Sequence, residues 1–128
     1  MPPSGTKTLR SHRPRHPPLR RSAHGYPAIL KSALDATYGE WVRRPVSFVS
    51  YGGWSGGTRA VEQLRQVVVE LQMAPVRGSV VLQFAPRLFD EDGRLQNAEF
   101  FEAAATRMLD DLAWWAAALK EARTRGSE

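Results

Sequence analysis

The residues best suited to chemistry form a glycine-rich turn between an apolar segment and a helical pattern. The turn contains four glycines, Gly52, Gly53, Gly56 and Gly57. Glycine has no side chain and reaches positive φ, so such a turn can lie directly against a flat ring or a phosphate. Backbone N–H groups where a strand passes into a helix are suited to holding an anionic or flat ligand.

Two familiar nucleotide-binding motifs do not fit this turn. It contains no G-x-G-x-x-G, and Gly57 precedes Thr58 at the position where a Walker motif has its lysine. Hydrolysis of a nucleoside triphosphate is therefore not expected. A merely flexible connection between a strand and a helix remains an open alternative at this point.

The segments around the turn predict an alternation of helices and strands. Pro27 suits the first turn of a helix whose apolar residues recur from Ile29 to Tyr38, until Gly39 ends the pattern. We expect strands at 45–51 and 74–82, helices at 58–71 and 98–123, and a solvated turn at 90–93. Because a strand, a helix and a second strand follow one another, the class is α/β with a parallel sheet.

Composition limits the class of protein. The chain has 128 residues, which is one domain at most, and it has no cysteine, so disulfides and thiolate chemistry are excluded. The lack of cysteine makes the cytoplasm the expected location. No apolar run approaches the roughly 20 residues that cross a bilayer, so no membrane partner is expected.

The net charge of +5 arises from the beginning of the chain. Six of the 18 basic residues lie in residues 1–23, and the remaining 12 stand against 13 acidic residues. Residues 1–23 are also rich in proline, so we expect a disordered basic leader followed by a domain at 24–125. His12, His16 and His24 do not suggest a metal site, and nucleic-acid binding by so short a basic tract is a minor alternative.

Two stretches of the chain resemble the NAD(P)H-dependent FMN reductase family. They are the stretch that begins His24-Gly25-Tyr26-Pro27, and Ser50-Tyr51-Gly52-Gly53 with the helix from Arg59 that follows it. The two motifs stand in the family's order and at the right distance. The resemblance covers about residues 24–123 and implies a flavodoxin-like, doubly wound parallel sheet with FMN across the carboxyl ends of its strands.

The resemblance also implies which residues contact the flavin. The candidates are His24, Gly25, Tyr26, Ser50, Tyr51, Gly52, Gly53 and, as a shield for the ring, Trp54. NADPH or NADH would be the co-substrate, because hydride passes from nicotinamide to flavin and the protein mainly binds and aligns the two. No side chain is predicted as acid, base, nucleophile or metal ligand, and Asp35 and Glu62 are expected on the solvated surface.

The chain departs from the family pattern before His24. The family's first strands and its phosphate-binding loop are not found there, so we expect a truncated domain with N-terminal strands missing, weakened FMN binding and self-association. A homo-oligomer is expected. Two alternatives remain open: an inactive remnant that acts at most as an association module, and a basic-tailed binder of nucleic acid.

Overall fold

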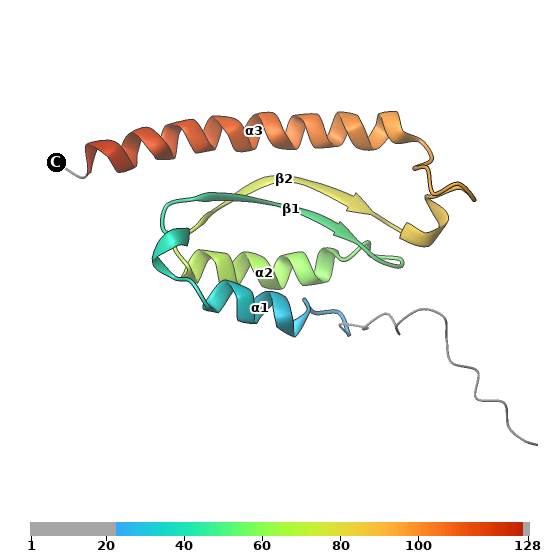
Figure 1. The fold of residues 1–128 in the computed structure, drawn as a ribbon, viewed down its shortest axis with the longest axis horizontal. Helices are drawn as coiled ribbons and strands as arrows, with labels where there is room; N and C mark the ends of the chain where they lie inside the picture. The colour runs from blue at the N-terminus through green and yellow to red at the C-terminus, as the bar shows by residue number, and fades with distance from the viewer. Residues whose placement is uncertain (1–22, 127–128) are drawn as a thin grey trace, which may run out of the picture.

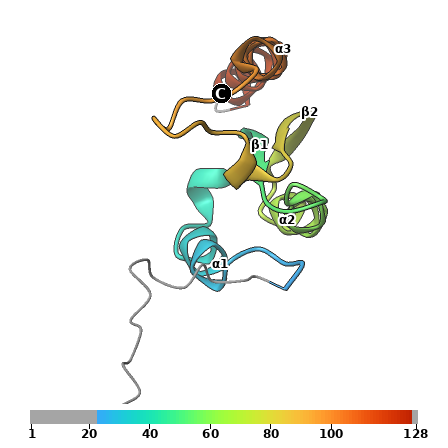
Figure 2. The same ribbon diagram turned by 90° about the vertical axis from the view of Figure 1, so that its right-hand side faces the viewer.

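The computed structural model describes residues 23–126 and arranges them in three layers (Figure 1). A two-stranded sheet is packed by the long helix α3 on one face and by α2 on the other, and α1 lies on the α2 side, farther from the strands, as the end-on view in Figure 2 also shows. The elements in chain order are α1 (Ala28–Asp35), the 3-10 turn η1 (Gly39–Trp41), β1 (Pro45–Tyr51), α2 (Thr58–Glu70), β2 (Ala74–Leu82), the 3-10 turn η2 (Ala85–Arg87) and α3 (Ala98–Arg125).

The two strands are parallel, as the sequence predicts. Pro45 pairs with Ala74 at one end, Tyr51 pairs with Leu82 at the other, and the register shifts between Val46 and Phe48. Parallel strands need a crossover connection, and α2 supplies it. The carboxyl ends of both strands therefore meet at one edge of the sheet, where the glycine turn begins.

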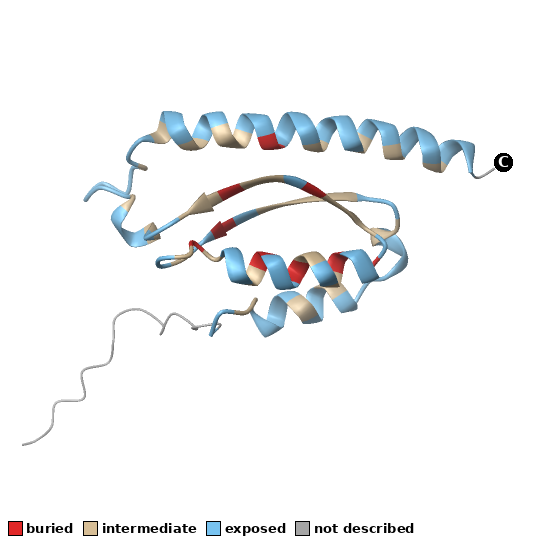
Figure 3. Ribbon diagram, turned by 180° about the vertical axis from the view of Figure 1, so that it is seen from behind, coloured by how far each residue is buried: buried red, intermediate tan, exposed pale blue. Residues whose placement is uncertain are grey.

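The core lies mainly between α2 and the sheet. The buried apolar side chains are Val61, Leu64, Val68 and Leu71 from α2 and its end, Val76 and Val80 from β2, and Met108 from α3 (Figure 3). The α2 residues recur at spacings of three and four, so they form one stripe of the helix. This stripe confirms the helix that the sequence predicts after the glycine turn.

The first helix is shorter than predicted. α1 ends at Asp35, although the apolar pattern continues to Tyr38. The Trp41 indole N–H donates to the Leu34 carbonyl at 3.0 Å, and that carbonyl would otherwise accept from Tyr38 in a longer helix. The 3-10 turn η1 follows instead, so a tertiary contact decides where this helix ends.

The last helix packs on β2 at a glycine. α3 runs to Arg125, two residues beyond the prediction, and Met108 is its one buried side chain among the described residues. A Cβ on Gly78 would lie 3.3 Å from the Met108 Cα, so the missing side chain is what lets helix and strand approach so closely. Most of α3 remains partly or wholly exposed (Figure 3).

The acidic turn after η2 is held by its own backbone. One carboxylate oxygen of Asp90 accepts from the amides of Asp92 at 3.0 Å and Arg94 at 2.8 Å. Its acidic side chains are exposed, which agrees with the predicted solvated turn. The predicted leader lies outside the described residues, apart from Ala23.

Candidate functional site

The glycine turn leaves the carboxyl end of β1 and is tied to the segment that follows β2. The Gly52 amide donates to the Leu82 carbonyl at 3.2 Å and so prolongs the parallel ladder. The carbonyls of Gly53 and Gly52 accept from the amides of Phe84 and Ala85, at 3.0 and 3.1 Å. Two loops from neighbouring strands therefore form one joined surface.

The fold itself explains three of the four glycines in the turn. Gly56 and Gly57 have φ of 57° and 83°, and a Cβ would lie 2.4 Å from the Val81 side chain at the first and 2.9 Å from the Tyr51 carbonyl oxygen at the second. A Cβ on Gly52 would lie 3.1 Å from the Gly57 amide nitrogen. These positions need glycine for conformation or for space.

Gly53 needs glycine for neither reason. It is exposed, its φ lies outside the left-handed range, and a Cβ built on it would meet nothing within 4 Å. Within residues 23–126, the amides of Gly53, Trp54 and Ser55 donate to no protein acceptor. The tip of the turn thus carries three backbone N–H donors that have no protein acceptor in the described part of the chain.

The side chains of Ser50 and Tyr51 lie on opposite faces of β1. Ser50 is buried, and its Cβ lies next to the place where a Cβ on Gly57 would stand. Its Oγ has no hydrogen-bond partner in the described part of the chain. Tyr51 is exposed at the end of the strand. Of these two predicted flavin contacts, the structure presents only the tyrosine side chain at the surface.

An aromatic pair borders the turn. Trp54 is 80 % exposed, its carbonyl accepts from the Gln83 amide group at 2.9 Å, and its ring meets the Phe84 ring edge to face at 5.7 Å. The Arg87 guanidinium lies 5.4 Å from the centre of the Phe84 ring. The sequence pattern does not indicate Phe84 or Arg87 as site residues, although both follow the second parallel strand and so lie at the same end of the sheet as the turn.

His24 reaches the same region from the start of the described chain. The two ring nitrogens of His24 lie 3.1 and 2.8 Å from Nη1 of Arg59, and its carbonyl accepts from Gln63 at 3.4 Å. Arg59 stands in the first turn of α2, two residues after Gly57. The structure therefore brings the predicted stretch His24 to Tyr26 beside the end of the glycine turn, with Gly25 and Tyr26 half-buried.

Asp35 ends α1, and Glu62 lies in α2. On α1, a hydrogen bond from Lys31 to the Asp35 carboxylate raises the pKa of the lysine. Glu62 is exposed and lies 3.7 Å from the Arg65 guanidinium. No cluster of metal-ligating side chains occurs in the described part. Asp35 and Glu62 are surface residues, as predicted.

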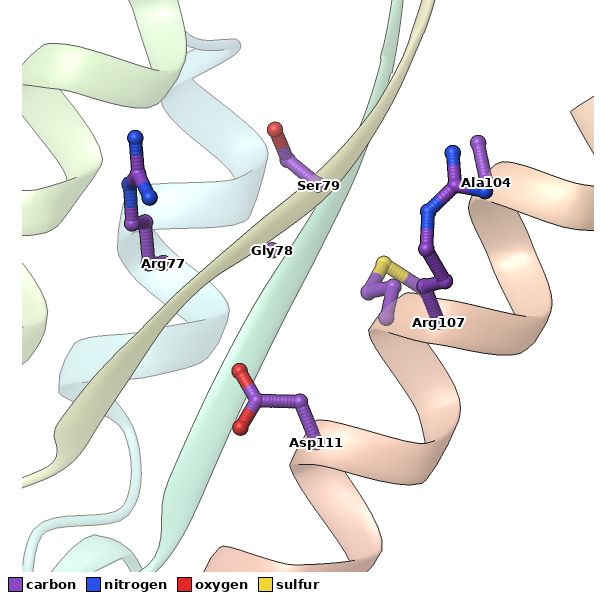
Figure 4. A pocket seen from close by; sticks show the side chains of 7 residues that line it. Arg77, Gly78, Ser79, Ala104, Arg107 and Asp111 are labelled. Carbon is purple, nitrogen blue, oxygen red and sulfur yellow. The ribbon is translucent and has the colours of Figure 1, made fainter.

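A separate hollow lies between β2 and α3, and it is not part of the glycine turn. It has a volume of about 480 Å³ and is lined by Arg77, Gly78, Ser79, Ala104, Arg107, Met108 and Asp111 (Figure 4). None of these is a predicted flavin contact.

A parallel sheet between helices, with a bare glycine turn at its carboxyl edge, is the arrangement of flavin-binding and nucleotide-binding α/β proteins. The family model described as NADPH-dependent FMN reductase matches residues 23–87. The chain belongs to this family, and its fold is part of a flavodoxin-like α/β domain. The match spans α1, β1, the glycine turn, α2 and β2, and thus every predicted site residue.

Individual relatives agree with this assignment. An NAD(P)H-dependent FMN reductase of Saccharomyces cerevisiae is 46% identical over 57 residues, which is 44% of this chain and 29% of the relative. One of Schizosaccharomyces pombe is 47% identical over 60 residues, 45% of this chain and 30% of the relative. A probable NADPH:quinone oxidoreductase of rice is 39% identical over 79 residues, 57% and 40% of the two chains. The chain thus spans less than a third of the two fungal relatives.

Among the described residues, no helix is both long and apolar enough to pass through a membrane.

Proposed function

We propose that this chain is a flavoprotein oxidoreductase that binds FMN at the glycine turn and takes hydride from NADPH or NADH. Membership of the family supports the cofactor and the co-substrate. The two loops that are joined by backbone hydrogen bonds at the carboxyl ends of the strands support the glycine turn as the place where FMN binds. When bound, FMN supplies the redox chemistry by accepting hydride and passing its electrons to an acceptor.

The residues of the turn would hold and orient the ring. The free amides of Gly53, Trp54 and Ser55 would donate to polar atoms on its rim, because they have no protein acceptor in residues 23–126. Tyr51 and Trp54 would exclude water from its flanks, since both rings are exposed beside the turn. His24, fixed against Arg59, would close the end nearest α2, with Gly25 and Tyr26 following it.

The observation that carries this proposal is the glycine at position 53. Neither φ nor crowding explains it, and the space beside its Cα is empty. A ligand that lies flat on the backbone does explain it, because any side chain would hold that ligand away. The other glycines of the turn are required by the fold itself, so they do not distinguish a ligand-binding turn from a merely structural one.

The test is a titration of FMN fluorescence with the purified chain and the variant Gly53→Leu. We expect quenching with the natural chain and at least about a tenfold weaker affinity in the variant, equal to about 1.4 kcal/mol. The matched control is Gly39→Leu, since a Cβ there also meets nothing within 4 Å and its φ is also outside the left-handed range. Both variants should keep the natural urea midpoint.

Two results would contradict the proposal. One is an unchanged affinity for FMN in Gly53→Leu, and the other is equal weakening by Gly39→Leu. Bleaching of bound FMN by NADPH or NADH then tests the oxidoreductase activity separately from binding. We further propose a homo-oligomer and a cytoplasmic location, and we rank an association module without catalysis second, because apolar side chains such as Ile29, Val49 and Trp114 are exposed.

A further inference from the structure

A cation lies next to the glycine turn, on the segment that follows β2. Arg87 ends the 3-10 turn η2, and its guanidinium lies 5.4 Å from the centre of the Phe84 ring. The Phe84 ring in turn meets the ring of Trp54, which belongs to the glycine turn, at 5.7 Å. Two rings and a guanidinium therefore form a continuous row that begins at the glycine turn.

The backbone fixes the position of Arg87 relative to the turn. The Phe84 amide donates to the Gly53 carbonyl at 3.0 Å, and the Arg87 amide donates to the Phe84 carbonyl at 2.7 Å. Pro86 lies within η2, and its ring restricts the φ angle of that short segment. The backbone of Arg87 is therefore held at the carboxyl ends of the strands before any ligand arrives.

The contact with Phe84 leaves the guanidinium able to bind a further group. A cation is attracted to the face of an aromatic ring electrostatically, so the N–H groups of the guanidinium can still donate hydrogen bonds. Arg87 is exposed, and within residues 23–126 no carboxylate lies at ion-pair distance from it. A planar guanidinium binds phosphate through two parallel N–H···O bonds. The chemistry expected of Arg87 is therefore recognition of a phosphate group.

The neighbouring charged groups have other contacts. Arg59, at the start of α2, has its Nη1 2.8 Å from Nε2 of His24. Asp90 follows Arg87 by three residues, and one oxygen of its carboxylate accepts from two backbone amides of its own turn. In the described part of the chain, the Arg87 guanidinium thus contacts an aromatic ring and has no charged partner.

We propose that Arg87 binds the diphosphate of the nicotinamide dinucleotide, with Phe84 holding its guanidinium in place. This role rests on the proposed function, since hydride transfer requires the nicotinamide ring to lie against the flavin ring at the glycine turn. One ribose separates the nicotinamide ring from the diphosphate. The two steps of 5.7 and 5.4 Å that lead from Trp54 to the guanidinium leave room for that ribose.

The position of Arg87 favours the diphosphate over the 2′-phosphate that distinguishes NADPH from NADH. The 2′-phosphate lies beyond the diphosphate, on the second ribose, and is therefore farther from the nicotinamide ring. A guanidinium two ring contacts away from the turn is close to the first of these groups along the dinucleotide. We therefore expect Arg87 to contribute equally to the binding of NADPH and NADH.

The first test measures the binding of NADP⁺ and of ADP-ribose to the full chain by calorimetry, with and without saturating FMN. ADP-ribose contains the diphosphate but no nicotinamide. Arg87→Gln should weaken both affinities about tenfold, because a bidentate contact with the diphosphate is lost. The matched control is Arg107→Gln, since Arg107 is also exposed and has no ion pair within residues 23–126, but lies on α3 beside the hollow. The control should keep the natural affinities.

Two results of this titration overturn the proposed role of Arg87. One is that Arg87→Gln binds both ligands as tightly as the natural chain, and the other is that the natural chain binds neither ligand at about 10 mM. Arg87→Lys separates phosphate recognition from charge alone, because lysine keeps the charge but has no planar fork; its affinity should be about threefold below that of the natural chain. If Arg87→Lys binds both ligands with the natural affinity, the bidentate contact is wrong.

Steady-state kinetics with a phosphate-free hydride donor tests whether Arg87 acts through the diphosphate. In Arg87→Gln, we expect the KM for NADPH and for NADH to rise about tenfold with little change in kcat, because the lost contact is the same in ground state and transition state. The KM for 1-benzyl-1,4-dihydronicotinamide, which has no phosphate, should stay unchanged. An equal rise for that donor would mean a structural role, and a rise for NADPH alone would mean a contact with the 2′-phosphate; either result contradicts the proposal.

FMN also carries a phosphate, so the two sources of phosphate are tested separately. Arg87→Gln should leave the affinity for FMN unchanged relative to that for riboflavin, as measured by fluorescence quenching. A selective loss of FMN affinity would assign Arg87 to the flavin phosphate and overturn its role in binding the dinucleotide. Failure of the proposed function has a different result: the natural chain then binds no FMN, while the titration with ADP-ribose in the absence of FMN still decides whether Arg87 binds a diphosphate.

Discussion

At the scale of single residues, the glycine turn contains glycines that the fold requires and one glycine, Gly53, that it does not. Gly56 and Gly57 adopt φ values that other residues rarely adopt, and both are crowded by their neighbours. Gly53 stands four positions away with an ordinary backbone and open space beside it. Glycine therefore serves the fold at positions 56 and 57, whereas neither conformation nor crowding requires it at position 53.

Replacing Gly57 with alanine should destabilise the protein without a ligand being present. The new Cβ would lie 2.9 Å from the Tyr51 carbonyl oxygen at a φ of 83°, which combines a steric clash with left-handed strain. We expect a loss of about 2 kcal/mol in the free energy of unfolding. Urea denaturation followed by circular dichroism measures it.

Gly39→Ala is the comparison for that substitution, because a Cβ there meets nothing within 4 Å. It should change stability by no more than about 0.5 kcal/mol. Equal effects of the two substitutions would show that the conformation of Gly57 is not what the fold requires.

At the scale of elements, the sequence predicts what depends on local pattern. β1, α2 and β2 agree closely with prediction, because an apolar strand bounded by Pro45, a stripe from Val61 to Leu71 and a second apolar strand are local signals. The end of α1 was predicted too late, since it depends on the Trp41 indole reaching the Leu34 carbonyl. No pattern around residue 34 contains that information.

The candidate site likewise contains residues that the sequence predicts and residues whose role depends on tertiary contacts. Motif resemblance was enough to select His24 and the turn from Ser50 to Trp54, and the contact between His24 and Arg59 now connects the two stretches. Phe84 and Arg87 were missed because their relation to Trp54 arises only when β2 pairs with β1. The burial of the Ser50 side chain likewise depends on the path of the turn into α2.

The packing of α2 predicts a contrast between adjacent valines. Val68 is 2 % exposed, so Val68→Ala leaves a cavity under the sheet and should cost about 2 kcal/mol of stability. Val69→Ala removes the same atoms from an exposed position and should stay within about 0.5 kcal/mol of the natural chain. Urea midpoints of the two variants decide whether α2 packs in the orientation described.

The close contact between α3 and β2 predicts that a larger side chain at position 78 will loosen α3. A Cβ on Gly78 would lie 3.3 Å from the backbone of Met108, so Gly78→Val should push α3 away from the sheet. We expect amide exchange to accelerate along α3 while α2 keeps its protection, because α2 packs on the opposite face. Uniform acceleration of α2 and α3 would mean that the fold opens only as a whole.

At the scale of the whole molecule, the proposed flavin-binding surface and the excess of positive charge lie in different parts of the chain. The turn and the aromatic pair belong to a body in which 12 basic residues stand against 13 acidic ones, whereas residues 1–23 hold six basic residues and no acidic one. The described turn offers donors and rings to a flat ligand. Any attraction for the FMN phosphate from residues 1–23 would be mainly electrostatic and therefore sensitive to salt.

Comparing FMN with riboflavin separates these two contributions. At low salt the full chain should bind FMN more tightly than riboflavin, and the preference should shrink toward unity at about 1 M NaCl, where screening acts over roughly 3 Å. The double variant Arg20→Gln with Arg21→Gln should reduce the preference for FMN and leave riboflavin affinity unchanged, because we propose that the glycine turn contacts only the ring. Fluorescence quenching of both flavins measures this. A preference for FMN that ignores salt and survives the double variant would place the phosphate contacts within the folded body instead.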